Sequence, residues 1–239
     1  MIAKEVVNAL KLVATEERRK VNEWFFKTGK GEYGYGDIFL GVNVPDLRRI
    51  AKKFSHEISL KELTELIRSP IHEVRLCALI ILVNKYKKEY SDKIYQYYLK
   101  HLNSVNNWDL VDTSAPHIVG DYLYKNPEKS KILFEFARSK NIWVRRISIV
   151  STFTFIRNNE FNKTLEIAKL LLFDEHDLIH KAVGWMLREI YKREDCLIKR
   201  FLRQNYAQIP RTTLRYAIER MDEEERLLYL KGNFDASQK

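Results

Sequence analysis

The 239-residue sequence contains little cysteine, glycine or proline, with two, eight and five residues respectively. Cys77 and Cys196 are too few for a disulfide framework or a cysteine metal site, which fits a reducing compartment. The low glycine and proline content excludes a fibrous or disordered chain. No run approaches the roughly 18 uncharged apolar residues of a membrane span, and the N-terminus lacks the apolar core of a signal peptide. These absences predict a globular cytoplasmic protein.

Positive charge is what the chain has in excess. Its 42 Lys and Arg residues outnumber 32 Asp and Glu residues, which gives a formal net charge of +10. An excess of this size favours a polyanionic partner, either nucleic acid or, with less support, an anionic membrane surface. Charge alone does not decide between the two.

Apolar residues recur at helical spacing along almost the whole chain, which predicts an all-α protein. Residues typical of helix starts interrupt the pattern at Ser59, Ser91, Pro127 and Pro210. Residues 142–156, "IWVRRISIVSTFTFI", are rich in β-branched side chains and could also form a strand. Their length without a turn residue favours a helix.

A repeat of helix pairs is the more specific feature of the sequence. The second, more apolar helix of each pair begins near Val74, Trp108, Val144 and Ile179, at spacings of 34, 36 and 35 residues. This period predicts an α-solenoid of HEAT-like repeats with a concave basic face, although it is shorter than the roughly 40–47 residues usual for HEAT. We expect a single domain over residues 1–230.

Two segments depart from the repeat. Residues 28–44 hold five of the eight glycines and show no helical period. The glycine spacing within residues 29–34 matches a dinucleotide-binding fingerprint, but the strand and helix that such a site needs are missing. Two interpretations stay open: a flexible basic-aromatic loop beside a binding cleft, or a plain connector. Residues 231–239 are typical of a disordered tail.

The stretch "NNWDLVD" places a large ring and a carboxylate on the same helix face. In a helix that begins near Asn106 or Asn107, Trp108 and Asp112 lie one turn apart. Asp109 has a sufficient explanation as a first-turn acid that interacts with the helix dipole. Trp108 and Asp112 are therefore a candidate pair for acting on one ligand.

Asp112 lies past the capping positions and between apolar neighbours, where a carboxylate loses hydration unless something compensates. Pro116 has no N–H to donate to the carbonyl of residue 112, so we expect the helix to kink there. The alternative is structural, with Asp112 in a salt bridge to a neighbouring repeat, for example to Arg146, and Trp108 in simple packing.

The following repeats carry basic residues interleaved with tryptophan. Arg145 and Arg146 fall in one repeat, and Lys181, Trp185 and Arg188 share a helix face in the next. This combination suits a surface that binds phosphates and packs rings against sugars or bases. Taken singly, each residue could equally be paired, solvated or part of the core.

A zinc pair is the remaining candidate site. His176 and His180 have one-turn spacing, but the sequence shows no third ligand near them. We therefore predict no metal site.

The segments "NNWDLVDTSAPHIVGDYL", "NIWVRRISIV" and "HKAVGWMLRE" resemble, in order, those of the AlkD-type DNA alkylation repair family, alkylpurine DNA glycosylases built from HEAT-like repeats. The resemblance implies excision of positively charged N3- or N7-alkylated purines from double-stranded DNA, in base excision repair, by a monomer without cofactors. It implies catalytic roles for Trp108, Asp112 and Trp185 and a backbone contact for Arg146. At the N-terminal end, Phe25 and Phe26 stand in the region where the family has a DNA-contacting tyrosine.

The set of predicted DNA-binding residues combines these observations: Arg145, Arg146, Lys181, Arg188, Phe25 and Phe26. Two alternatives remain from other functional classes. One is a family member that binds damaged or branched DNA without excising bases, and the other is a protein-interaction solenoid.

Overall fold

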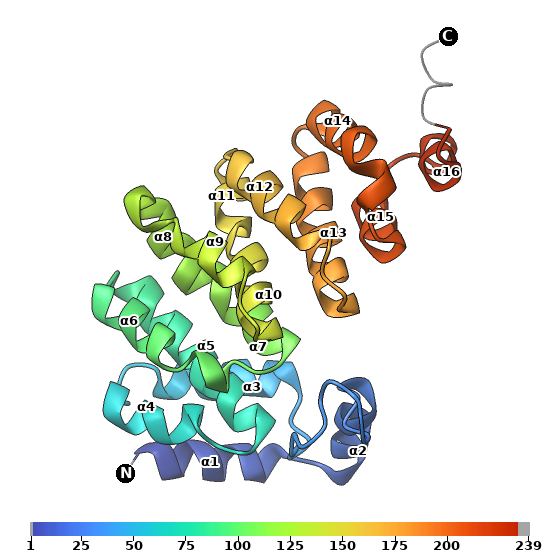
Figure 1. Ribbon diagram of the computed structural model, residues 1–239. Coiled ribbons are helices and arrows are strands. Elements are labelled where there is room, and N and C mark those ends of the chain that lie inside the picture. The colour runs from blue at the N-terminus through green and yellow to red at the C-terminus, as the bar shows by residue number, and fades with distance from the viewer. Residues whose placement is uncertain (1, 234–239) are drawn as a thin grey trace. The chain divides into compact units, whose positions relative to one another are not determined.

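The computed structural model describes residues 2–233, and these pack as two compact units that divide between Ile118 and Val119. The helices of the N-terminal unit are α1 (Ile2–Val13), α2 (Glu16–Phe25), α3 (Val44–Phe54), α4 (Leu60–Ile67), α5 (His72–Lys88), α6 (Asp92–Lys100), the 3₁₀ turn η1 (Leu102–Ser104) and α7 (Trp108–Ala115). Within this unit, α5 packs against α3, α4 and α7 (Figure 1).

The division falls within the π-helical segment η2 (Pro116–Gly120), and the C-terminal unit begins at Val119. Its helices are α8 (Asp121–Lys125), η3 (Pro127–Lys129), α9 (Ile132–Ala137), α10 (Ile142–Ser151), α11 (Phe153–Arg157), α12 (Asn162–Leu171), α13 (Asp177–Tyr191), α14 (Asp195–Asn205), η4 (Tyr206–Gln208), α15 (Arg211–Ala217) and α16 (Glu223–Lys231). Helix α13 is central here and packs against α10, α12, α14 and α15.

The predicted helical class is confirmed for the part of the chain that the structure describes. Its one extended pairing there is an isolated bridge between Ile38 and Ile71. Residues 142–156, the stretch that could have been a strand, form α10 and α11. None of the helices between residues 2 and 233 has both the length and the apolar character needed to cross a membrane.

The helix starts follow from local chemistry. Ser59 and Glu62 form a capping box before α4, in which each side chain accepts the other residue's backbone N–H at 3.2 Å. Pro127 opens η3, and Pro210 directly precedes α15. Ser91 precedes α6 but makes no side-chain capping bond. The predicted boundaries therefore hold at all four places, with capping bonds at one of them.

The repeat is visible in equivalent helices. Val74, Val144 and Ile179 are each the third residue of their helix and are buried. Trp108 is instead the first residue of α7, so Leu110, which is fully buried, occupies the equivalent position. The predicted alignment is thus wrong by two residues in this repeat, because Trp108 opens α7 and the buried third residue of the helix is Leu110.

An arginine joins the two helices of a pair in two of the repeats. Arg75, the fourth residue of α5, donates through Nη1 to the carbonyl oxygen of Ser69 at 2.9 Å. Arg145, the fourth residue of α10, makes the same bond to the carbonyl of Ser139 at 2.9 Å. Both serine hydroxyls in turn accept a backbone N–H two residues further on. The repeat therefore includes the connection between helices as well as their apolar faces.

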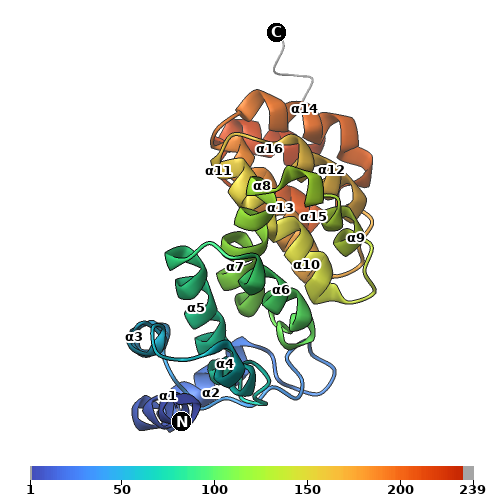
Figure 2. The ribbon, with the colours of Figure 1, turned by 90° about the vertical axis from the view of Figure 1, so that its left-hand side faces the viewer.

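The Gly-rich segment forms turns between α2 and α3 and contains no helix. It lies beside α2 in both views (Figure 1 and Figure 2). The buried carboxylate of Glu73 accepts the backbone N–H groups of Leu40, Gly41 and Val42 at 2.9, 2.9 and 3.3 Å. Gly41 has φ +93°, and a Cβ there would lie 2.1 Å from the carbonyl oxygen of Thr15. The end of the segment is therefore held in one conformation that requires glycine at residue 41.

The predicted domain limits stay a prediction. Each of the two units is compact by itself, whereas the sequence suggested one domain over residues 1–230. The proposed tail, residues 231–239, begins at the last residue of α16, and residues 234–239 lie outside the described part. The concave basic face likewise stays a prediction.

Candidate functional site

Helix α7 is short because its two ends are fixed by specific residues. Asn107 is the N-cap and accepts the backbone N–H of Trp108 through its side-chain oxygen at 2.8 Å. At the other end, Pro116 follows Ala115 and the chain changes to the π-helical segment η2. The regular α-helix therefore ends at Pro116, while the predicted kink at this residue stays a prediction. Trp108 and Asp112, one turn apart on α7, are both half-buried.

Trp108 belongs to a cluster of rings that we call the aromatic cluster: Phe25, Phe26, Phe39, His72 and Trp108. Phe26 stacks on Trp108 with ring centroids 5.4 Å apart, and Phe25 meets the same ring edge-on at 5.8 Å. The imidazole of His72 stacks on Phe39 at 4.6 Å. The structure therefore brings together three of the predicted residues, Phe25, Phe26 and Trp108.

A charged network lies beneath this cluster and is centred on His72, which is 1% exposed. Its Nε2 bonds a carboxylate oxygen of Asp109 at 2.8 Å, and its Nδ1 bonds Asp37 at 3.1 Å. Asp37 also accepts bonds from Arg75 at 2.5 Å and from the side chain of Asn107 at 3.0 Å. The network therefore ties the Gly-rich segment to the starts of α5 and α7.

The network shifts two pKa values in opposite directions. Burial by itself would lower the pKa of His72, but the carboxylates of Asp109 and Asp37 outweigh it and raise the pKa to about 9. Burial would raise the pKa of Asp37, but bonds from His72, Arg75 and Asn107 lower it to about 2. At neutral pH the centre of the network is therefore a buried imidazolium between two carboxylates.

Nothing in the sequence singles out this network. Asp109 has an ordinary explanation as a first-turn acid, and His72 lies in an apolar helix 35 residues from Asp37. The chemistry depends on a long-range contact that residue spacing does not reveal. Asp109, in the first turn of α7, thus has a second role, which is to bind the side chain of His72 at the start of α5.

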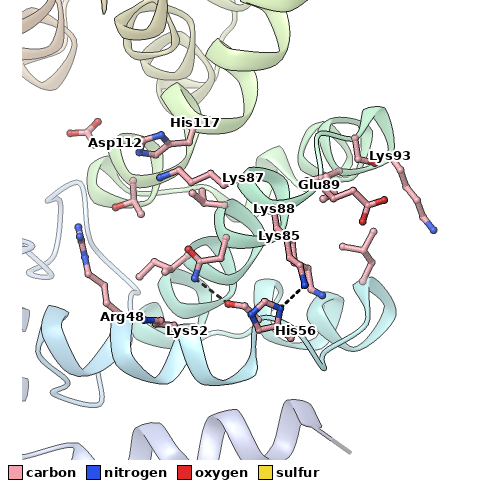
Figure 3. Close-up of a pocket in the computed structure, with 18 residues that line it drawn as sticks. Arg48, Lys52, His56, Lys85, Lys87, Lys88, Glu89, Lys93, Asp112 and His117 are labelled. Carbon is pink, nitrogen blue, oxygen red and sulfur yellow. Dashed lines mark hydrogen bonds between the residues drawn. The ribbon is translucent and has the colours of Figure 1, made fainter.

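Asp112 lines a cavity of about 930 Å³ in the N-terminal unit, which we call the basic cavity (Figure 3). Its lining includes six basic side chains and only two carboxylates, Asp112 and Glu89. The basic residues are Arg48, Lys52, Lys85, Lys87, Lys88 and Lys93. This excess of positive charge makes the cavity a candidate site for phosphate groups.

The three lysines that α5 contributes to the basic cavity, Lys85, Lys87 and Lys88, have different surroundings. Figure 3 shows the side chain of Lys87 extending toward Asp112 and His117. Lys88 donates to Nδ1 of His56 at 3.2 Å on another part of the wall. Burial and the nearby charge of Lys88 lower the pKa of Lys85. From sequence, these lysines are ordinary last-turn residues of α5 that interact with the helix dipole, so their common cavity was not predicted.

A second cavity of about 410 Å³ adjoins the first, and we call it the aromatic cavity. All five members of the aromatic cluster line it. Three residues, Arg48, Ile80 and Thr113, line both cavities. Trp108 thus faces an apolar space and Asp112 a basic one, on either side of Thr113.

In the C-terminal unit, the two predicted arginines of α10 already have protein partners. Arg146 is 5% exposed and donates to the carbonyl oxygen of Leu178. Arg145 forms an ion pair with Asp174 at 2.6 Å, besides its bond to the Ser139 carbonyl. These bonds give both arginines a structural role. Their contacts with DNA stay predictions.

The predicted face of α13 is a stripe that reaches solvent. Lys181, Trp185 and Arg188 are half-buried, while their neighbours on the helix are buried. Lys181 pairs with Asp177 at 2.8 Å, and Arg188 pairs with Glu219. The ring of Trp185 lies 5.8 Å from that of Phe153. The shared face is thus as expected, and its contact with DNA stays a prediction.

The histidines of the proposed zinc pair are engaged in backbone contacts. His176 caps α13 by accepting the N–H of Leu178 at 3.1 Å. His180 bonds the carbonyl oxygen of Asp174 through Nε2. Both residues therefore have a structural explanation.

The sequence profile of the family described as "DNA alkylation repair enzyme" matches residues 6–221. The chain belongs to this family. A role in the repair of alkylated DNA, and with it DNA binding, follows from membership of the DNA alkylation repair enzyme family. Among curated proteins, none matches the sequence.

Solved structures share the fold of this DNA alkylation repair family member at low identity. A "predicted DNA alkylation repair enzyme" from Enterococcus faecalis has a TM-score of 0.72 and 16% identity, over 88% of this chain and 97% of that one. AlkD2 from Streptococcus mutans has a TM-score of 0.57 and 17% identity, over 87% and 99%. The protein smu.31 from Streptococcus mutans UA159 gives 0.56 and 18%, over 93% and 100%. These likenesses confirm the predicted helical-repeat fold.

Proposed function

We propose that the protein is a DNA glycosylase that hydrolyses the N-glycosidic bond of N3- or N7-alkylated purines in duplex DNA, as a step of base excision repair in the cytoplasm. Membership of the DNA alkylation repair enzyme family supports the repair role. The observation that carries the proposal is the position of Asp112, a half-buried carboxylate in the wall of a strongly basic cavity. We propose that it acts as a monomer.

The chemistry asks little of the leaving group. A purine alkylated at N3 or N7 is cationic, so it departs as a neutral base without needing a strong general acid. Positive charge instead develops on the deoxyribose as the bond breaks, as in other glycosyl transfers. A fixed carboxylate stabilises that charge and can orient the attacking water, and aromatic faces contribute as well.

Each proposed catalytic residue has a distinct part in this reaction. Asp112 supplies the negative charge beside the sugar, and lysines of the basic cavity hold the flanking phosphates. Trp108 packs against the sugar from the aromatic cavity. Trp185, on the half-buried stripe of α13, is the third proposed residue, and its part is to pack its ring face against the sugar as well.

The test is Asp112→Asn, which keeps the shape of the side chain and removes its charge. We expect single-turnover release of 7-methylguanine or 3-methyladenine to fall by about 10²- to 10³-fold, while DNA affinity and melting temperature stay close to wild type. The matched control is Glu89→Gln, since Glu89 is the other carboxylate of the same cavity; its release rate should be unchanged.

Two results would contradict the proposal in different ways. A wild-type protein that binds alkylated duplex but releases neither base would support DNA binding without catalysis. An Asp112→Asn variant with a lower melting temperature and an unchanged release rate would show that Asp112 is a structural ion-pair partner.

A further inference from the structure

The aromatic cavity has the character of a ligand site. Its volume of about 410 Å³ lies within the roughly 300–1,000 Å³ of cavities that bind small molecules. Its walls are mainly rings and aliphatic side chains, among them Phe26, Phe39, Trp108, Leu47, Leu76 and Ile80. Flat aromatic walls suit a flat ligand.

The mouth of this cavity exposes apolar side chains to solvent. Phe25 is 52% exposed, and Val21 and Val44 are 44% and 45% exposed. All three line the cavity and come from α2 and α3. Single exposed apolar side chains are common on protein surfaces, but several of them around one opening are typical of a binding site.

The charged part of the lining includes two carboxylates, Glu73 and Asp109, and two arginines. Glu73 already accepts backbone N–H groups and Asp109 already bonds His72, whereas the arginines differ from their neighbours. Arg19 pairs with Glu16 and Glu23, and Arg49 pairs with Asp46. Arg18 and Arg48 line the cavity instead, and neither guanidinium has an ion-pair partner among residues 2–233. The unpaired arginines therefore point to an anionic group on the ligand.

We propose that the aromatic cavity binds one unpaired nucleotide of a DNA duplex, with its base against Phe25 and Trp108 and its phosphates beside Arg18 and Arg48. The ring walls match the base, and the arginines match the phosphates. The shared lining of the two cavities lets one strand pass from the lysines of the basic cavity to the mouth of the aromatic one. The inference rests on the DNA-binding part of the proposed function and not on base excision.

The experiment compares two duplexes of the same sequence, one fully paired and one with a single bulged adenine, by fluorescence anisotropy. We expect wild type to bind the bulged duplex more tightly, because stacking one base on an aromatic side chain is worth about 5- to 150-fold in affinity. Phe25→Ala should bring the ratio of the two Kd values close to one. Trp24→Ala is the matched control, since Trp24 is 80% exposed on the same helix but outside the cavity, and it should keep the ratio.

A second pair of variants tests the phosphate contact at equal net charge. Arg18→Gln should weaken binding of the bulged duplex more than that of the paired one. Arg19→Gln, which changes a paired arginine outside the cavity, should affect both duplexes equally.

Several results would overturn the proposal. Equal wild-type affinity for the two duplexes, or a Phe25→Ala variant that weakens both equally, would show that no unpaired base enters the cavity. Binding of free deoxyadenosine monophosphate as tightly as the bulged duplex would assign the site to a free nucleotide. Base release from methylated DNA without a preference for the bulge would refute this site alone, whereas the preference without base release would refute only the glycosylase.

Discussion

The pH dependence of stability should report directly on the buried network around His72. Its pKa lies at about 9, against an ordinary value of 6.5. One pKa unit corresponds to about 1.4 kcal/mol, so the protonated imidazole stabilises the folded state by on the order of 3 kcal/mol. Because a typical domain is stable by only about 5–15 kcal/mol, this is a large share.

The sign follows from which state holds the proton. Below pH 6.5, His72 is protonated in both states and the full stabilisation is present. Between pH 6.5 and about 9, the unfolded chain releases the proton while the folded chain keeps it, so the free energy of unfolding falls as pH rises. Above about 9 both states are neutral and the contribution is gone.

The assay is urea-induced unfolding followed by tryptophan fluorescence across this pH range. His72→Gln keeps N–H donors in its side-chain amide but carries no charge, so it should be less stable at neutral pH and should lose the alkaline slope. His101→Gln is the matched control: His101 is also buried, at 4% exposed, but its pKa is lowered by burial. A wild-type stability that stays flat from neutral pH to about 9, or a slope that survives in His72→Gln, would refute this account.

Two further predictions concern the same unit. Lys87→Ala should weaken binding to any duplex and reduce the salt slope of log Kd by about one, whereas Lys100→Ala, outside the basic cavity, should leave the slope unchanged; equal slopes would exclude Lys87 as a phosphate contact. Gly41→Ala should lower the free energy of unfolding by more than about 2 kcal/mol, because it adds a clash to backbone strain. Gly31 has a similar φ, but a Cβ there would meet open space, so chemical denaturation of Gly31→Ala should show a smaller loss of unfolding free energy. Equal losses in the two variants would mean that backbone strain, without the clash, explains the effect.

Much of the fold could be predicted because its signals are local. Helical periodicity and the box at Ser59 depend on residues within a turn or two of each other, and the structure follows them. The alignment at Trp108 was wrong for a local reason too. Tryptophan is a residue type common in protein cores, but the fully buried side chain at the equivalent position is that of Leu110. A half-buried aromatic at a helix start cannot be told from a core residue by its type alone.

The candidate site was predictable where residues share one helix and obscure where they do not. Trp108 and Asp112 are one turn apart, so their common helix follows from spacing. The contact of Phe26 with Trp108 crosses more than 80 residues, and the resemblance to a known family, not periodicity, suggested that end of the chain. The His72 network and the lysines around Asp112 depend on tertiary packing, and no pattern of short range encodes them.

The carboxylate of Glu73 has a consequence for hydrogen exchange. The amide hydrogens of Leu40, Gly41 and Val42 point at this buried acceptor, although their segment has no helix. They can exchange with solvent only when the segment separates from α5, so the three should exchange at one common, slow rate. This irregular, glycine-containing stretch would then be protected from hydrogen exchange about as well as helix α5, which holds it. The set of slowly exchanging amides would identify Glu73 as the side chain that fixes this segment.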